Sequence, residues 1–271
     1  MSNTAQTAQA GPVLLEARHE GIATLVMNRP DRLNALNNEL AIAVNDAFGR
    51  IAKDETVRVV VITGAGRAFC AGGDLGLLAH GHQTGKTQEL EPLLRAGMQM
   101  VLKMRTLPQP VIAAVNGAAA GAGMNIALAA DIRIAAEEAT FGQNFAKIGL
   151  FPDYGGSYFL PQLVGLAKAA ELFYTGEMID AKTALSLGIV NQVVPAAQLE
   201  AEVKTLAQKI AQGPALAIQA VKKDLFAREE KELSRALENE VQEQNRCYAS
   251  EDCKEGLRAF FEKRRPRFQG K

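Results

Sequence analysis

The sequence predicts an α/β fold in which turns of strand, strand and helix are stacked and a helical C-terminal region follows. Two apolar runs, at residues 57–63 and 111–115, have the length and composition of buried strands. Each is followed by a turn rich in Gly and Ala and then by a possible helix. Beyond about residue 165 only 189–194 has the composition of a hydrophobic strand. This order favours stacked turns over a doubly wound sheet.

The N-terminal third is predicted to contain a hairpin, a helix and the first buried strand. Residues 13–19 and 22–28 are expected to pair as an antiparallel hairpin. Apolar residues recur at helical spacing over 37–52, which predicts an amphipathic helix. After the buried strand, residues 79–87 are polar and contain Gly, so we expect a loop before a helix that ends near Arg105.

The middle of the chain repeats the order strand, strand, helix without repeating the letters of the sequence. A helix is expected after Gly123, and short strands are expected at 132–135 and 140–141. The helices predicted for the rest of the chain span 167–175, 181–187, 198–212, 215–246 and 252–264. Gly213 and Pro214 separate the longest of these helices from the helix before it.

The chain is expected to divide into a disordered tail at 1–12, an α/β core at 13–200 and a helical region at 201–271. The tail lacks the basic start and the apolar stretch of a targeting signal. Three cysteines without a CxxC pattern suit a reducing compartment, so a cytoplasmic location is expected.

The balance of charges argues against a protein that binds nucleic acid or another polyanion. The chain has 30 basic and 30 acidic residues and no net charge at pH 7. A membrane span is not expected either, because the longest apolar stretch, 111–130, is mostly Ala and Gly and contains Asn116 and Asn125. We expect that stretch to form a buried strand, a turn and a helix.

The two Gly-rich turns are the first candidates for a functional site. Residues 116–123 carry few side-chain atoms and lead into a helix, whose N-terminus offers free backbone N–H groups to an anion or a developing oxyanion. Taken alone, each turn is more simply explained by close packing of helix on strand. A dinucleotide fingerprint is excluded in the first turn because Phe69 occupies the position of its last Gly, and neither turn ends as a P-loop does.

Five sequence blocks resemble, in order and spacing, those of the enoyl-CoA hydratase/isomerase (crotonase) superfamily. They are NRPDRLNAL at 28–36, AFCAGGDL at 68–75, AVNGAAAGAGMNIALAADIRIA at 114–135, FGQNFAKIGLFPDYGG at 141–156 and EGLRAFFEKRRPRF at 255–268. The resemblance implies a spiral of ββα turns whose C-terminal helices cover the core and build a trimer or a dimer of trimers. It also implies an acyl-CoA thioester substrate, no metal, and no cofactor besides the coenzyme A that the substrate carries.

The same resemblance gives the Gly-rich turns a joint role. It implies that the backbone N–H groups of Gly73 and Ala122 form an oxyanion hole for the thioester carbonyl. Ala71 and Asp74 are expected to lie at the substrate, although Asp74 also suits the N-cap of the helix that follows it.

The acid and base residues differ from those of the family's hydratases. Those enzymes carry two glutamates, whose positions hold Asn125 and Phe145 in this chain. Neither residue can act as a base, and both are expected to contact the substrate. One carboxylate remains, Asp153, which its own neighbours make a candidate helix cap. The segment looks most like the ring-1,2-epoxyphenylacetyl-CoA isomerase and enoyl-CoA isomerase group, and this similarity implies that Asp153 is catalytic.

Basic and aromatic residues are candidates for a coenzyme A site. Arg29 and Arg32 could meet phosphate groups or belong to a solvated turn. Phe260 and Lys263 match family positions that reach the coenzyme A of a neighbouring subunit, and an amphipathic terminal helix would explain them equally well.

Other charged or metal-ligating residues are expected to have no site role. His80 and His82 lack a third ligand for a metal and are expected to be exposed. Lys222, Lys223 and the alternating charges of 228–246 are interpreted as a solvated helix face.

The favoured hypothesis is an enoyl-CoA isomerase in which Asp153 takes a proton from one carbon of an unsaturated acyl-CoA and returns it to another. An enoyl-CoA hydratase of low activity is the second hypothesis. A third makes Asp153 a nucleophile that forms an ester with the substrate. In a fourth, the protein is a non-catalytic relative that binds acyl-CoA or RNA.

Overall fold

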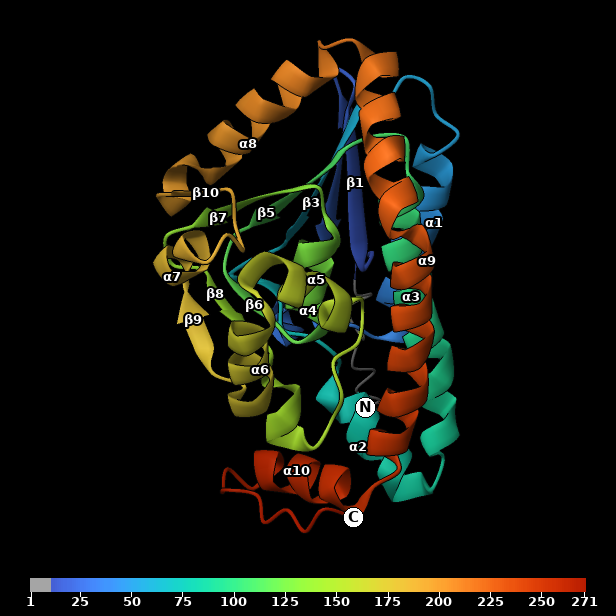
Figure 1. Ribbon diagram of the computed structural model, residues 1–271, viewed down its shortest axis with the longest axis vertical. Helices are drawn as coiled ribbons and strands as arrows, with labels where there is room; N and C mark the ends of the chain where they lie inside the picture. The colour runs from blue at the N-terminus through green and yellow to red at the C-terminus, as the bar shows by residue number, and fades with distance from the viewer. Residues whose placement is uncertain (1–10) are drawn as a thin grey trace, which may run out of the picture.

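A six-stranded sheet lies at the centre of the molecule and is parallel except at one edge, where β1 and β2 form the predicted hairpin (Figure 1). The structure, a computed structural model, describes residues 11–271. Most of the predicted tail at 1–12 therefore lies outside the described residues. In spatial order the strands are β1 (Leu14–His19), β2 (Ile22–Met27), β3 (Val59–Gly64), β5 (Val111–Val115), β7 (Ile132–Ala136) and β10 (Gln192–Val194).

A second, four-stranded sheet contains three short strands, each of which follows a strand of the first sheet, and one strand that lies between helices. Its strands are β4 (Ala68–Cys70), β6 (Ala118–Ala120), β8 (Thr140–Gly142) and β9 (Met178–Asp180). The pairs β3 and β4, β5 and β6, and β7 and β8 each place one strand in either sheet before the chain enters a helical segment. This arrangement confirms the predicted spiral of strand, strand and helix.

The large sheet is buried on both faces, which explains why its strands are continuous apolar runs. In β5, Val111, Ala113 and Val115 face the main core, where α1 (Asn38–Ile51), α3 (Glu91–Thr106) and α4 (Ala122–Ala129) pack. The alternate residues Ile112 and Ala114 face α8 (Ala196–Ala211) in a second core. Helix α8 contributes Leu199, Val203 and Ala207 to this second core.

Residues 79–87, predicted to be a loop, mostly belong to helix α2 (Leu75–Thr84), so the prediction was wrong. The helix is stabilised at both ends, since Asp74 accepts a hydrogen bond from the N–H of Gly76 and Gly85 ends it in the left-handed conformation. Gly81 lets Tyr248 approach, because a Cβ at position 81 would lie 2.5 Å from the Tyr248 hydroxyl. His82 packs on that tyrosine ring with the centroids 4.5 Å apart, so it is half-buried rather than exposed as predicted.

The C-terminal part of the chain is mainly helical, as predicted. Helix α9 (Ala215–Tyr248) runs beside α3, and α10 (Glu251–Phe261) lies across one end of the molecule against α2 (Figure 1). Residue 200, where the α/β core was predicted to end, falls inside α8 (Ala196–Ala211). The remaining helices are α5 (Gly156–Val164), α6 (Leu166–Thr175) and α7 (Ala181–Ser186), with short 3-10 turns η1 (Pro30–Arg32), η2 (Thr87–Leu90) and η3 (Asn144–Ile148). Within residues 11–271, no helix combines the length and apolar character that a bilayer crossing requires.

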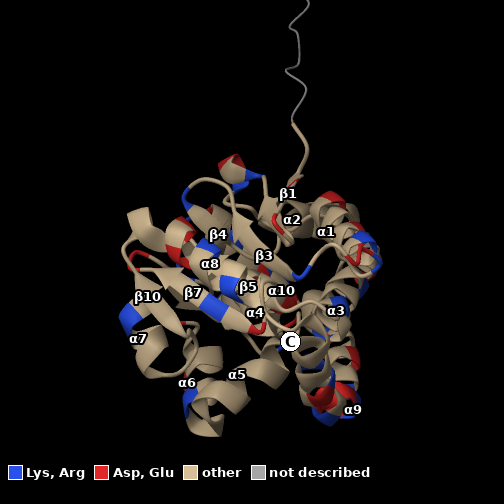
Figure 2. Ribbon diagram, turned by 90° about the horizontal axis from the view of Figure 1, so that it is seen from above, with Lys and Arg blue, Asp and Glu red and all other residues tan. Residues whose placement is uncertain are grey.

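Charged residues are frequent along α9 (Figure 2), and most of them are exposed as predicted, but Lys222 and Glu240 are buried. Lys222 is 6% exposed, and its ammonium donates to the carbonyl oxygens of Met104 and Gln109 at 2.9 Å and to Asp131 at 2.7 Å. A buried ammonium is stable only with such partners. Lys222 therefore fastens the start of α9 to the end of α3. Lys223, one residue further on, is exposed as predicted.

Candidate active site

A cavity of about 170 Å³ lies where the start of α4, the end of β4, α3, η3, α9 and α10 meet. Apolar side chains make up most of its wall, which suits an acyl chain more than a charged ligand. The leucines in that wall are Leu36, Leu75, Leu78, Leu90, Leu93 and Leu94. Of the predicted site residues, the cavity brings together Ala71, Gly73, Ala122, Phe145, Asp153 and Phe260.

The N–H of Gly73 points away from the segment that contains Leu36, with which Gly73 forms a parallel bridge. Leu36 donates to the carbonyl of Gly72 at 2.7 Å and accepts from the N–H of Asp74 at 2.9 Å, so Gly73 is its bridge partner. In a parallel bridge of this kind the middle residue points its own N–H and C=O to the other side. Gly73 is thus free to offer its amide to the cavity that it lines.

The N–H of Ala122 is the first of helix α4 and has no acceptor within the helix. Gly121, the N-cap, has φ +52° and ψ −127°, a conformation that favours glycine. Gly123 allows α4 to start against β4, because a Cβ there would lie 2.0 Å from the carbonyl oxygen of Cys70. Among residues 11–271, neither Gly73 nor Ala122 uses its N–H in a turn, loop or cap hydrogen bond. Two residues of the cavity wall therefore have backbone amides without a backbone acceptor of this kind.

Asp153 lines the cavity with one carboxylate oxygen free. Its Oδ2 accepts a hydrogen bond from the Gln244 side chain at 3.0 Å, and its Oδ1 is buried without a partner among the described residues. The local sequence suggested that Asp153 caps a helix, but at helix α5 another residue takes that role. At the start of α5 the N–H groups of Gly155 and Ser157 donate to Glu240, at 2.7 and 3.0 Å. The carboxylate of Asp153 is thus not used as a cap.

The pKa of Asp153 is raised to about 7, mainly by burial; the hydrogen bond from Gln244 acts to lower it, and the negative charge of Glu240 acts to raise it. A carboxyl group with a pKa near 7 can accept and donate a proton at neutral pH. Burial also raises the pKa of the neighbouring Tyr154 well above its usual value, so this phenol stays neutral. Asp153 is therefore the group in this wall that is suited to proton transfer.

Asn125 does not line the cavity, in contrast to its predicted place at the substrate. It is fully buried, its Nδ2 donates to the backbone carbonyl of Asp153 at 2.7 Å, and its Oδ1 accepts from Gln143 at 2.5 Å. A Cβ on Gly156 would lie 2.3 Å from the Asn125 amide, so α5 starts directly on this side chain. The amide pair fixes the backbone that carries Asp153.

Phe145 lines the cavity beside the predicted oxyanion hole, because a Cβ on Gly121 would lie 3.4 Å from its ring. Arg29 and Asp74 lie elsewhere and bind each other at 2.9 Å, and Asp74 caps α2. Since Arg29 also donates to the carbonyl of Ala35, its guanidinium is occupied by the protein itself. The predicted contact of this pair with substrate thus lacks support from its placement.

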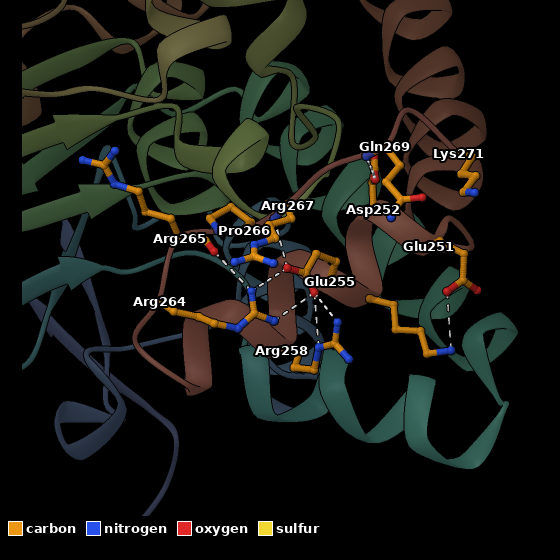
Figure 3. A pocket seen from close by; sticks show the side chains of 11 residues that line it. Glu251, Asp252, Glu255, Arg258, Arg264, Arg265, Pro266, Arg267, Gln269 and Lys271 are labelled. Carbon is orange, nitrogen blue, oxygen red and sulfur yellow. Dashed lines mark hydrogen bonds and ion pairs between the residues drawn. The ribbon is translucent and has the colours of Figure 1, made fainter.

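Arg32 is exposed in η1 and does not line the cavity. Phe260 lines it from α10 of the same chain with 55% of its side chain exposed, while Lys263 lies exposed just beyond that helix. The chain then folds back over α10 and forms a wide charged hollow (Figure 3). In it Glu255 pairs with Arg258 and Arg264, and the two arginines lower the pKa of this carboxyl group.

Among the polar residues at the cavity, sequence reasoning missed Asn144, Lys147, Gln244 and Tyr248 in its wall, and Glu240 behind Asp153. The sequence of α9 did contain a pattern that indicates its buried face, because positions 237, 241, 244 and 248 recur at helical spacing. All four are buried in the structure. Lys147 is exposed. No group of three or more potential metal ligands occurs among residues 11–271.

Comparisons with known proteins agree with this geometry. A family model for enoyl-CoA hydratase/isomerase matches residues 17–271. A probable enoyl-CoA hydratase of Rhodobacter capsulatus is 42% identical over 93% of this chain and 96% of its own. The 1,2-epoxyphenylacetyl-CoA isomerase of Escherichia coli is 38% identical, over 95% and 98%. Among solved structures, an enoyl-CoA hydratase from Mycobacterium avium subsp. paratuberculosis has a TM-score of 0.86 and 35% identity, covering 95% of this chain and 98% of its own.

Proposed function

The chain is an enzyme of the enoyl-CoA hydratase/isomerase family, and we propose that it moves a carbon–carbon double bond along an acyl-CoA thioester. One observation carries the proposal. Asp153 is the single carboxylate among the described residues that line the cavity, and it shares this cavity with the amides of Gly73 and Ala122. Family membership makes the hypothesis of a non-catalytic relative wrong.

The proposed reaction uses these groups in two steps. The thioester oxygen accepts hydrogen bonds from the N–H groups of Gly73 and Ala122, so negative charge can build up on it. The free oxygen of Asp153 takes a proton from a carbon beside the double bond, and a dienolate forms. Asp153 then returns the same proton to the carbon at the far end of the dienolate. The double bond has moved and no atom has been gained or lost.

Hydration is the second candidate, because two of the most similar relatives carry the name hydratase. Adding water requires a base for the water and an acid for the α-carbon. Asn125 and Phe145 occupy the two positions where the family's hydratases have glutamates, and neither can transfer a proton. Measuring 3-enoyl-CoA isomerisation and crotonyl-CoA hydration on one preparation decides between the two candidates.

Lys263 is proposed to contact a phosphate of coenzyme A, despite the zero net charge of the protein. Replacing Lys263 with Glu should raise the KM by about fivefold and leave kcat nearly unchanged, because one surface charge contact is worth about 1 kcal/mol in water. Lys223→Glu, an exposed charge reversal on α9, is the matched control. An unchanged KM in the Lys263 variant would mean that the terminal segment does not reach coenzyme A.

We propose that the enzyme assembles as a trimer or a dimer of trimers. Large apolar side chains remain exposed on the single chain: Leu166 and Tyr174 of α6 are both 81% exposed, and Leu216 of α9 is 86% exposed. Burial of such side chains between subunits would stabilise an assembly. Sedimentation at micromolar concentration should give the mass of three or six chains. A monodisperse monomer would contradict the proposal.

A further inference from the structure

Two residues of α9, one helical turn apart, hold the segment that carries Asp153. Glu240 accepts three hydrogen bonds at the start of α5, from the N–H of Gly155 at 2.7 Å, from the N–H of Ser157 at 3.0 Å and from the Ser157 hydroxyl at 2.6 Å. Helix α5 has no side-chain cap of its own, since Gly155 is its N-cap. A carboxylate from a distant helix thus takes over the capping role.

Gln244 holds the other end of the same segment. Its Oε1 accepts from the N–H of Phe151 at 2.8 Å, and its Nε2 donates to Oδ2 of Asp153 at 3.0 Å. The side chain is 4% exposed, so both contacts are shielded from water. Because only Oδ2 is bound, the carboxylate is oriented and Oδ1 keeps no hydrogen-bond partner among the described residues.

We propose that Glu240 and Gln244 are positioning residues that orient the Asp153 carboxylate and control its proton exchange with substrate. The inference rests on the proposed function, in which Asp153 moves the proton. Neither residue is a catalytic residue in this scheme, because neither receives the proton from substrate. Glu240 lies behind Asp153, and the two side chains border one small void of about 10 Å³ beside α3.

The two residues act on Asp153 in opposite directions. The negative charge of Glu240 raises the pKa of Asp153, and the hydrogen bond from Gln244 lowers it. The pKa of Glu240 is raised to about 7 by burial even though its three hydrogen bonds act to lower it, so the two carboxyl groups titrate in the same range. Since Asp153 has only one side-chain donor, we take Glu240 to be the member of the pair that loses its proton first.

The other groups around Asp153 do not compete with this pair. Burial raises the pKa of Tyr154 and, to about 12, that of Cys70, so both are neutral at pH 7. From α3, Leu94 and Met98 border the void without charge. Lys147 borders the cavity from η3 but is exposed to solvent, where water screens its charge.

The test is the pH dependence of kcat for 3-enoyl-CoA isomerisation by the full-length enzyme and two variants. Glu240→Gln removes the negative charge, so the pH midpoint of activity should fall by about one unit. Gln244→Leu removes the donor to Asp153, so the midpoint should rise by about one unit. The control is Glu238→Gln on the exposed side of α9, which should keep the parent midpoint.

An unfolded fraction that is constant across the pH range lowers the activity without moving the midpoint, so the folded fraction of each variant is measured by circular dichroism at every pH. If Glu240→Gln gives no soluble enzyme, the rise in Gln244→Leu still decides. Midpoints that stay at the parent value, or that shift in the same direction, would mean that the two residues are only structural. Failure of the proposed function has a different signature, because Asp153→Asn would then still isomerise the substrate.

Discussion

Replacing Asp153 with Asn is expected to lower the turnover of a 3-enoyl-CoA by about 10²–10⁴-fold, the usual effect of removing a positioned acid or base. Asn keeps the size of the side chain and can still accept the hydrogen bond from Gln244. It cannot take a proton from carbon. Coenzyme A affinity should therefore stay close to the parent value, and steady-state kinetics with a binding measurement would separate the two effects.

Asp224→Asn is the control for this variant, because Asp224 is exposed on α9 and pairs only with Arg228 among the described residues. It should isomerise the substrate at the parent rate. A near-parent rate in Asp153→Asn would reduce Asp153 to a structural residue. Rapid hydration of crotonyl-CoA by the parent enzyme would contradict the inference that Asn125 and Phe145 make the enzyme unable to add water.

The stability of Asp153→Asn provides an independent check. Burial raises the pKa of Asp153 from 3.8 to about 7, so the folded state holds the proton more tightly than the unfolded state. Ionisation of Asp153 therefore costs stability, a cost that is absent below pH 3.8, grows up to pH 7 and is complete above it. At pH 8 the Asn variant should melt at or above the parent temperature. Such a result would indicate that Asp153 serves function at the expense of stability.

Replacing Ala122 with Pro is expected to lower kcat by about 10²–10³-fold, the usual loss when one oxyanion donor is removed. Ala122 is the first residue of α4, a position where Pro fits the helix because the N–H has no helical partner. The substitution removes one backbone amide of the cavity wall, and it also places the larger proline ring at a buried position. Steady-state kinetics should show the loss in kcat, with coenzyme A affinity retained.

Ala196→Pro is the matched control, because Ala196 is the first residue of α8 and does not line the cavity. Its activity should equal that of the parent. Equal losses of turnover and coenzyme A affinity in Ala122→Pro would show that the second Gly-rich turn serves packing alone.

Local patterns were sufficient to predict most of the secondary structure. The apolar runs at 57–63 and 111–115 became β3 and β5, and the alternation of their side chains between two cores explains why the runs are continuous. The short strand β9 and the second half of helix α2 were not predicted. The polar, Gly-containing sequence of α2 is typical of a loop. The helix forms because Asp74 caps its start and because it packs against Tyr248, the last residue of α9.

The sequence by itself determined the order of the elements, the two Gly-rich turns and the presence of Asp153, whereas the loss of the hydratase glutamates was implied by the family resemblance. Only the tertiary structure decided what surrounds that carboxylate. Glu240 and Gln244 lie more than 80 residues away from Asp153 and were assigned from sequence to a solvated face. Local pattern could not find them, because their role depends on where α9 crosses the start of α5. The long-range contact of α9, and not the residues next to Asp153, determines that Asp153 is not a cap and keeps one oxygen free.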